Sequence, residues 1–170
     1  MELGILLLRV VVGLTLAAHG AQKLFGWFGG HGIAGTAGLL EQLGFRPGRP
    51  YAYLAGCAEF CGGLSLALGV LTPVGVAATV GMMTTACVAA HLKNGFFNSD
   101  GGFEFPLVMA TGAAATALSG PGPYALDRLL GFERAVELAP WGILVGLVAA
   151  LLTLASRGLF VRGAQAQVSH

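Results

Sequence analysis

The sequence predicts an all-α membrane protein with a core of four transmembrane helices and a fifth C-terminal transmembrane helix. The 170 residues are 55% hydrophobic and only 10% charged, whereas a soluble domain carries about 25% charged residues. The apolar residues also form blocks close to the length that crosses a bilayer, about 20 residues. A net charge of +1 without a dense basic run gives no reason to expect a nucleic-acid partner. We therefore expect a multi-pass protein of the cell membrane, with the lipid bilayer as its surroundings.

The first apolar block, residues 3–25, is expected to be a retained helix rather than a cleaved leader. It begins with Glu2 and has no basic residue before Arg9, whereas a secretory leader normally begins with basic residues. Trp27 and Phe28 follow the block, and aromatic side chains favour the headgroup level. The helix should therefore end at a membrane surface.

A short surface helix and a helical hairpin are expected next. Residues 32–45 have apolar side chains at helical spacing, which predicts an amphipathic helix on the surface. Two transmembrane helices follow, at 51–71 and 73–92. Thr72 and Pro73 between them suit a tight turn and a helix start, so the two helices should be antiparallel.

The rest of the chain provides two shorter apolar blocks. A polar loop leads to a helix at 103–119, which is at the short end for spanning. Residues 120–139 contain prolines, glycines and spaced charges and are expected to lie at the interface. The last block, 141–155, is the expected fifth transmembrane helix. Small residues such as Ala58 recur along these helices, and helices associate in lipid through such residues.

The basic residues predict an orientation. If five helices span the membrane, one face receives Lys23, Arg46, Arg49, Lys93, Arg157 and Arg162, and the other receives Arg128 and Arg134 with Arg9 nearby. Positively charged residues favour the cytoplasmic side. The N-terminus is therefore expected outside the cell and the C-terminus in the cytoplasm.

Several ionisable residues occur inside the apolar blocks, where each charge costs about 2.5 to 3.5 kcal/mol on insertion scales. Counted from the helix ends, His19 and Glu59 lie about 9 to 12 Å below the same surface. Five residues gather in that half of the bundle and form a candidate polar ligand site: His19, Lys23, Glu59, His91 and Glu104.

A purely structural interpretation of these five residues stays open. In it, Lys23, His91 and Glu104 reach the headgroups, and His19 bonds a carbonyl. Glu59 has a short side chain that reaches water with difficulty, so it needs a partner or a proton.

Arg9, near the opposite surface, is expected to form a structural ion pair with Asp127 and to anchor residues 120–130 to the bundle. Cys57 and Cys61 share a helix face away from Glu59, and we expect them, like the third cysteine, to be small buried residues.

No metal site is expected, because no spacing resembles a zinc motif. A haem between His19 and His91 is disfavoured, because the two residues differ in depth.

Taken together, the polar and glycine-containing motifs resemble the DoxX family of membrane proteins. The matching stretches are Leu8-Arg9, His19-Gly20, Lys23 to Gly26, Glu59 to Gly63, His91 with Gly95 to Phe97, and Gly120 to Tyr124 followed by Asp127. The resemblance implies a four-helix membrane core over residues 1–130, and an association in some relatives with quinone- or thiol-linked redox systems. Residues 131–156 would then be an additional transmembrane helix and 157–170 a polar tail.

The leading hypothesis is a subunit of a membrane redox system whose polar site binds a quinone-like headgroup. A protein partner in a redox complex follows from it. The alternative is a non-enzymatic scaffold or assembly partner whose polar residues hold the bundle together. A small transporter is least favoured, because no inverted repeat is evident. The sequence leaves open whether the protein is an enzyme and whether it forms homo-oligomers.

Overall fold

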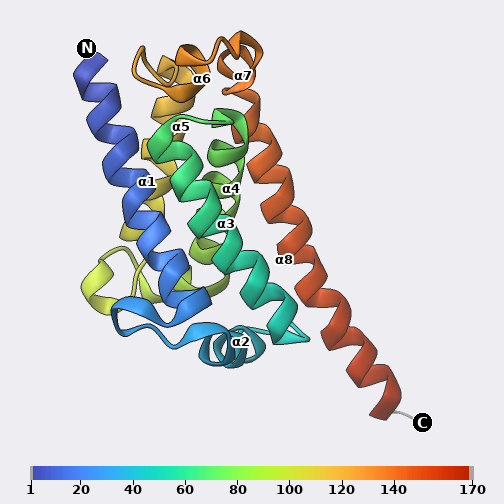
Figure 1. Ribbon diagram of the computed structural model, residues 1–170. Helices are drawn as coiled ribbons and strands as arrows, with labels where there is room; N and C mark the ends of the chain where they lie inside the picture. Colours follow the sequence, from blue (N-terminus) through green and yellow to red (C-terminus); the bar gives the residue numbers. More distant parts are fainter. Residues whose placement is uncertain (1, 169–170) are drawn as a thin grey trace.

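The computed structural model describes the backbone of residues 2–168 and the side-chain surroundings of residues 2–157. Within this range the chain is helical, with turns and loops and no strand. Five long helices run between the two ends of the molecule (Figure 1): α1 (Glu2–Phe25), α3 (Gly48–Leu68), α4 (Thr72–Ala86), α5 (Glu104–Ser119) and α8 (Trp141–Val168).

The shorter elements lie at the two ends of the bundle (Figure 1). They are α2 (Gly32–Gln42), α6 (Leu126–Leu129), α7 (Glu133–Leu138), 3-10 turns at Trp27–Gly29, Leu92–Asn94 and Asn98–Asp100, and a π-helical turn at Cys87–His91. We call the end that carries α2 and the loop 92–103 the α2 end. The opposite end, with the N-terminus, α6 and α7, is the α6 end. The surface helix expected at 32–45 is confirmed as α2.

Among the described residues, three helical stretches are long and apolar enough to cross a membrane, judged by length and composition: Glu2–Phe25, Gly48–Leu68 and Thr72–Asn94. Their mean hydropathy is 1.9, 1.2 and 1.5. α5, with 16 residues, and the apolar part of α8, Trp141–Arg157, are shorter. The predicted all-α membrane protein is confirmed.

α8 extends further than the sequence suggested. An apolar helix was expected at 141–155 with a polar tail after it, yet the helix continues to Val168. Residues 158–168 contain no proline, and alanine and glutamine favour the helix even where the side chains become polar. The more polar residues after Ala155 therefore end the apolar block, but α8 continues through them.

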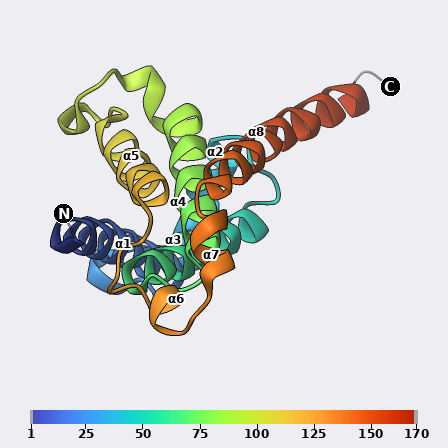
Figure 2. The same cartoon turned by 90° about the horizontal axis from the view of Figure 1, so that it is seen from above.

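α4 lies in the centre of the bundle, between α5 and α8 (Figure 2). Its inner face forms the core with α1, α3 and α5, through Val76, Val80 and Met83. α1 and α3 make the most extensive contact of the fold, and glycines permit it. A Cβ atom at Gly13 would lie 2.5 Å from the carbonyl oxygen of Gly63, so the two backbones touch. Close approach of this kind is how helices associate in lipid.

Exposed aromatic side chains lie at both ends of the bundle. Trp27, Phe28, Phe96 and Phe97 are exposed at the α2 end, and Tyr124, Phe132 and Trp141 at the α6 end. Between them the outer helix faces carry exposed apolar residues such as Leu7, Leu14 and Leu151. Two aromatic belts around an apolar middle are typical of a protein that spans a bilayer.

Candidate functional site

Among the described side chains, a salt bridge between a lysine and a buried carboxylate joins α1 to α3. Lys23, in the last turn of α1, donates from Nζ to Oε1 of Glu59, in the middle of α3. The side chain of Glu59 is 2% exposed and that of Lys23 is 30% exposed. The buried carboxylate therefore has the counter-charge that its short side chain requires, and the lysine connects the pair to the surface.

Glycines position this pair by letting α1 and α3 touch. Gly20 packs directly on the backbone of Phe60, and a Cβ at Gly56 would lie 2.6 Å from the Leu24 side chain. The carboxylate of Glu59 can therefore reach the neighbouring helix, although only two methylene groups separate it from its own backbone. Among the residues with described side chains, Oε2 of Glu59 is buried and has no hydrogen-bond partner.

His19 lies one turn before Lys23 on α1. Its ring packs against Phe105 of α5, with ring centroids 4.8 Å apart and planes at 45°. His19 and Lys23 lie on the same face of α1, because they are four residues apart in one helix. Within residues 2–157 the contact seen for this ring is aromatic, rather than a bond to a backbone carbonyl. We call His19, Lys23 and Glu59 the polar cluster; Phe105 closes it and had no separate signal in the sequence.

His91 and Glu104, also expected at this site, bond instead to the loop 92–103. Nδ1 of His91 lies 2.7 Å from the carbonyl oxygen of Gly101, and Glu104 accepts a hydrogen bond of 2.9 Å from the backbone of Asn98. The loop exposes backbone groups that need partners, and these two side chains supply them. Three of the five candidate residues thus form the cluster and two hold the neighbouring loop.

Arg9 and Asp127 are both buried but do not form the expected direct ion pair. Arg9 donates from Nη1 to the carbonyl oxygen of Ala67 at 3.0 Å and from Nη2 to that of Tyr124 at 2.6 Å. The C-terminal residues of α3 leave carbonyls without helical partners, and the guanidinium fork satisfies one of them. Arg9 therefore connects α1 to α3 and to the segment before α6.

The carboxylate of Asp127 binds the start of α4. It accepts hydrogen bonds from the backbone of Leu71 at 2.8 Å, from the backbone of Thr72 at 2.8 Å and from the Thr72 hydroxyl at 2.6 Å. Free N–H groups and the positive end of the helix dipole attract a carboxylate there. The expected ion pair was wrong in its geometry, because backbone groups of the two adjacent helix ends compete for both side chains.

The cysteines differ from the expectation in burial. Cys57 and Cys61 are exposed, Cys87 is half-buried, and all three are free thiols. The prediction that they are buried was wrong for the α3 pair, because that face of the helix has no neighbouring helix. Among residues 2–157 no group of three or more His, Cys, Asp or Glu side chains could hold a metal ion.

Comparison with known proteins matches these features to one family. Residues 4–92 match the model of the DoxX family. The chain belongs to the DoxX family. The matched segment contains nearly all of α1 and the whole of α2, α3 and α4, and with them all three residues of the polar cluster. Phe105 lies outside it.

A curated relative of this DoxX protein is the inner membrane protein YqjF of Escherichia coli (strain K12). The two are 29% identical over 131 residues, which cover 76% of this chain and 93% of the relative. No solved structure matches. The predicted family and the predicted multi-pass membrane protein are both confirmed.

Proposed function

We propose that this DoxX protein is a component of a membrane redox system and binds a quinone-like headgroup at the polar cluster. The observation that carries the proposal is the second oxygen of Glu59, which is buried and has no hydrogen-bond partner. A buried acceptor left unpaired costs about 1 to 3 kcal/mol. A ligand hydroxyl that donates to this oxygen would recover that cost.

The three side chains complement both redox forms of such a headgroup. A quinol hydroxyl can donate to the free oxygen of Glu59. A quinone carbonyl can accept from Lys23 or from an N–H of His19. Conversion between the two forms takes up or releases electrons together with protons. The cluster offers groups that carry protons, and the electrons would come from a protein partner in the same redox complex.

The decisive experiment measures quinone binding to the purified protein in lipid nanodiscs. A short-tailed quinone is titrated and tryptophan quenching is recorded, because Trp27 follows the end of α1 that carries Lys23, while Trp141 begins α8 at the opposite end. Wild type should show saturable quenching. Glu59→Gln should weaken it about tenfold or more, since a hydrogen bond to a charged group contributes about 1.5 to 3 kcal/mol.

Glu104→Gln is the matched control, because this carboxylate serves the neighbouring loop and its loss should leave the affinity unchanged. Absence of saturable quenching in wild type, or equal affinity in Glu59→Gln, would refute the proposal. The scaffold alternative predicts a different result: a lower folded yield for Glu59→Gln and no quinone binding by wild type.

We also propose that the α2 end faces the cytoplasm and that the N-terminus is external. In the part of the chain with described side chains, the α2 end carries Lys23, Arg46, Arg49, Lys93 and Arg157, and the α6 end exposes Arg128 and Arg134. Arg162 lies beyond the residues whose side chains are described. The excess of basic residues at the α2 end supports this orientation.

A further inference from the structure

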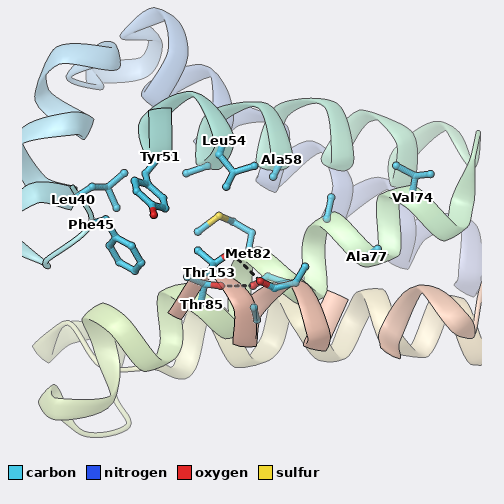
Figure 3. Close-up of a pocket in the computed structure, with 15 residues that line it drawn as sticks. Leu40, Phe45, Tyr51, Leu54, Ala58, Val74, Ala77, Met82, Thr85 and Thr153 are labelled. Atoms are coloured by element: carbon cyan, nitrogen blue, oxygen red, sulfur yellow. Dashed lines mark hydrogen bonds between the residues drawn. The ribbon is translucent and has the colours of Figure 1, made fainter. Parts of the chain in front are cut away.

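An apolar cavity separate from the polar cluster opens between α3, α4 and α8 (Figure 3). Its volume is about 300 Å³, which reaches the range of small-molecule sites. α3 contributes Leu54 and Ala58, α4 contributes Ala77 and Met82, and α8 contributes Ala150. Glu59 faces α1 on the other side of α3, so this cavity has no part in the proposed quinone site.

The few hydroxyl groups of the wall are already occupied. The Thr85 hydroxyl donates to the Gly81 carbonyl at 2.8 Å, and the Thr153 hydroxyl donates to the Ala149 carbonyl at 2.8 Å (Figure 3). Each of these two is a bond within its own helix, and the third hydroxyl of the wall, that of Tyr51, donates to the Ser156 hydroxyl at 2.8 Å. None of the three groups needs a ligand. The wall therefore suits a hydrocarbon chain and offers nothing to a polar headgroup.

The cavity has the depth of one membrane leaflet. On α4 it extends from Val74 to Thr85, a rise of about 16 Å at 1.5 Å per residue. One leaflet contributes about 15 Å of hydrocarbon, half of a core of about 30 Å. A chain that fills the cavity would enter at the α2 end, where Phe45 and Tyr51 form the wall.

The cationic side chain of Arg157 lies at that entrance. Arg157 is one turn beyond the cavity residue Thr153 on the same face of α8, and its guanidinium carbon lies 5.9 Å from the centroid of the Phe45 ring. Among the residues with described side chains, no carboxylate forms a salt bridge with Arg157. Glu41, a nearby acid, accepts a hydrogen bond from the backbone of Gly48.

We propose that the cavity between α3, α4 and α8 binds one acyl chain of an anionic phospholipid whose phosphate contacts Arg157. Three observations support it: an apolar wall whose hydroxyl groups are all bonded within the protein, a depth of one leaflet, and a cation at the headgroup level that has no carboxylate partner among the described side chains. Arg46 and Arg49, both exposed near the entrance, add to the attraction. Basic pockets between transmembrane helices bind anionic headgroups in this way.

The experiment is native mass spectrometry of the full chain, released from micelles that contain equal amounts of phosphatidylglycerol and phosphatidylcholine. Wild type should retain one phosphatidylglycerol in preference to phosphatidylcholine. Ala58→Leu fills the cavity and should lower retention of either lipid about tenfold. Arg157→Gln should lower the preference for phosphatidylglycerol about fivefold, the equivalent of about 1 kcal/mol for one basic residue.

Two controls separate site effects from damage to the fold. Ala155→Leu adds the same volume on an exposed position of α8 outside the cavity, and Arg134→Gln removes a charge at the α6 end; both should retain lipid as wild type does. All variants are compared by size-exclusion elution, and only folded fractions are analysed. Equal retention of the two lipids by wild type, or unchanged retention by folded Ala58→Leu, would overturn the proposal.

Discussion

Asp127 should be one of the most sensitive positions of the fold, although it lies in the four-residue helix α6. Its carboxylate is completely buried and accepts three hydrogen bonds of 2.6 to 2.8 Å from Leu71 and Thr72. The backbone of Asp127 also donates to the Gly69 carbonyl at 2.8 Å. One residue thereby holds the turn between α3 and α4 and the segment that leads to α8.

The magnitude follows from these bonds. A hydrogen bond to a charged group contributes about 1.5 to 3 kcal/mol, and a carboxylate at a helix N-terminus contributes about 0.3 to 1 kcal/mol more. The bonds share one carboxylate, so they do not add fully. We expect Asp127→Ala to lower the free energy of unfolding by about 3 to 5 kcal/mol, in line with the loss of one member of a buried polar network.

Asp127→Asn should fall between wild type and alanine. An amide oxygen at the Oδ2 position can still accept from Thr72, but the amide nitrogen then faces the N–H of Leu71 and two donors meet. The measurement is unfolding by sodium dodecyl sulfate in mixed micelles, followed by circular dichroism. The neighbouring exposed Arg128→Gln is the control and should change little. An unfolding free energy of Asp127→Ala within about 0.5 kcal/mol of wild type, the range of surface substitutions, would refute the reasoning.

Two further predictions concern helix packing and orientation. Gly63→Ala places a Cβ 2.5 Å from the Gly13 carbonyl oxygen and 2.6 Å from the Ala17 nitrogen, so it should lower the free energy of unfolding by about 1 to 3 kcal/mol in the same assay. The control Gly4→Ala has open space around the new Cβ and should leave the stability unchanged. Equal effects of the two substitutions would contradict the close contact between α1 and α3. A fluorescent protein fused after His170 should mature and fluoresce, because that end is expected in the cytoplasm. A phosphatase that is active only outside the cytoplasm should be inactive when it is fused at the same position. The reverse pattern would exclude the proposed orientation.

The sequence predicts the helices well because the apolar blocks have about the length that crosses a bilayer, and prolines and glycines separate them. The surface helix expected at 32–45 is observed as α2, Gly32–Gln42, and Thr72 and Pro73 form the start of α4, directly after the turn that joins it to α3. It could not predict the end of α8, because residues past Ala155 change polarity and keep helix propensity. The helix propensity of the residues determines where a helix ends, whereas the polarity of the side chains determines where it leaves the membrane.

Side-chain partners were harder to predict than depth. His19 and Glu59 were expected at similar depth, with Lys23 one turn from His19, and Lys23 does meet Glu59. His91 and Glu104 instead bond to a loop. Counting along a helix gives the depth of a side chain in the membrane. It does not give the side of the helix from which that side chain meets a neighbour, because this depends on which helix faces pack together. Free backbone groups compete for every polar side chain as well, and their positions are known only once the loops are folded.

The contact between α1 and α3 explains why a carboxylate can persist at this depth. Glycines bring the two backbones together, and that closeness lets Lys23 reach Glu59 while its own stem stays partly exposed. Larger residues at these positions would separate the helices and leave Glu59 without a counter-charge, at a cost of several kcal/mol. Both partners lie within the family-matched segment 4–92, whereas the lipid cavity depends on α8, which lies outside it. α3 contributes to both proposed sites, through Glu59 on one face and Ala58 on another, whereas a change on α8 reaches the cavity without altering a helix of the polar cluster.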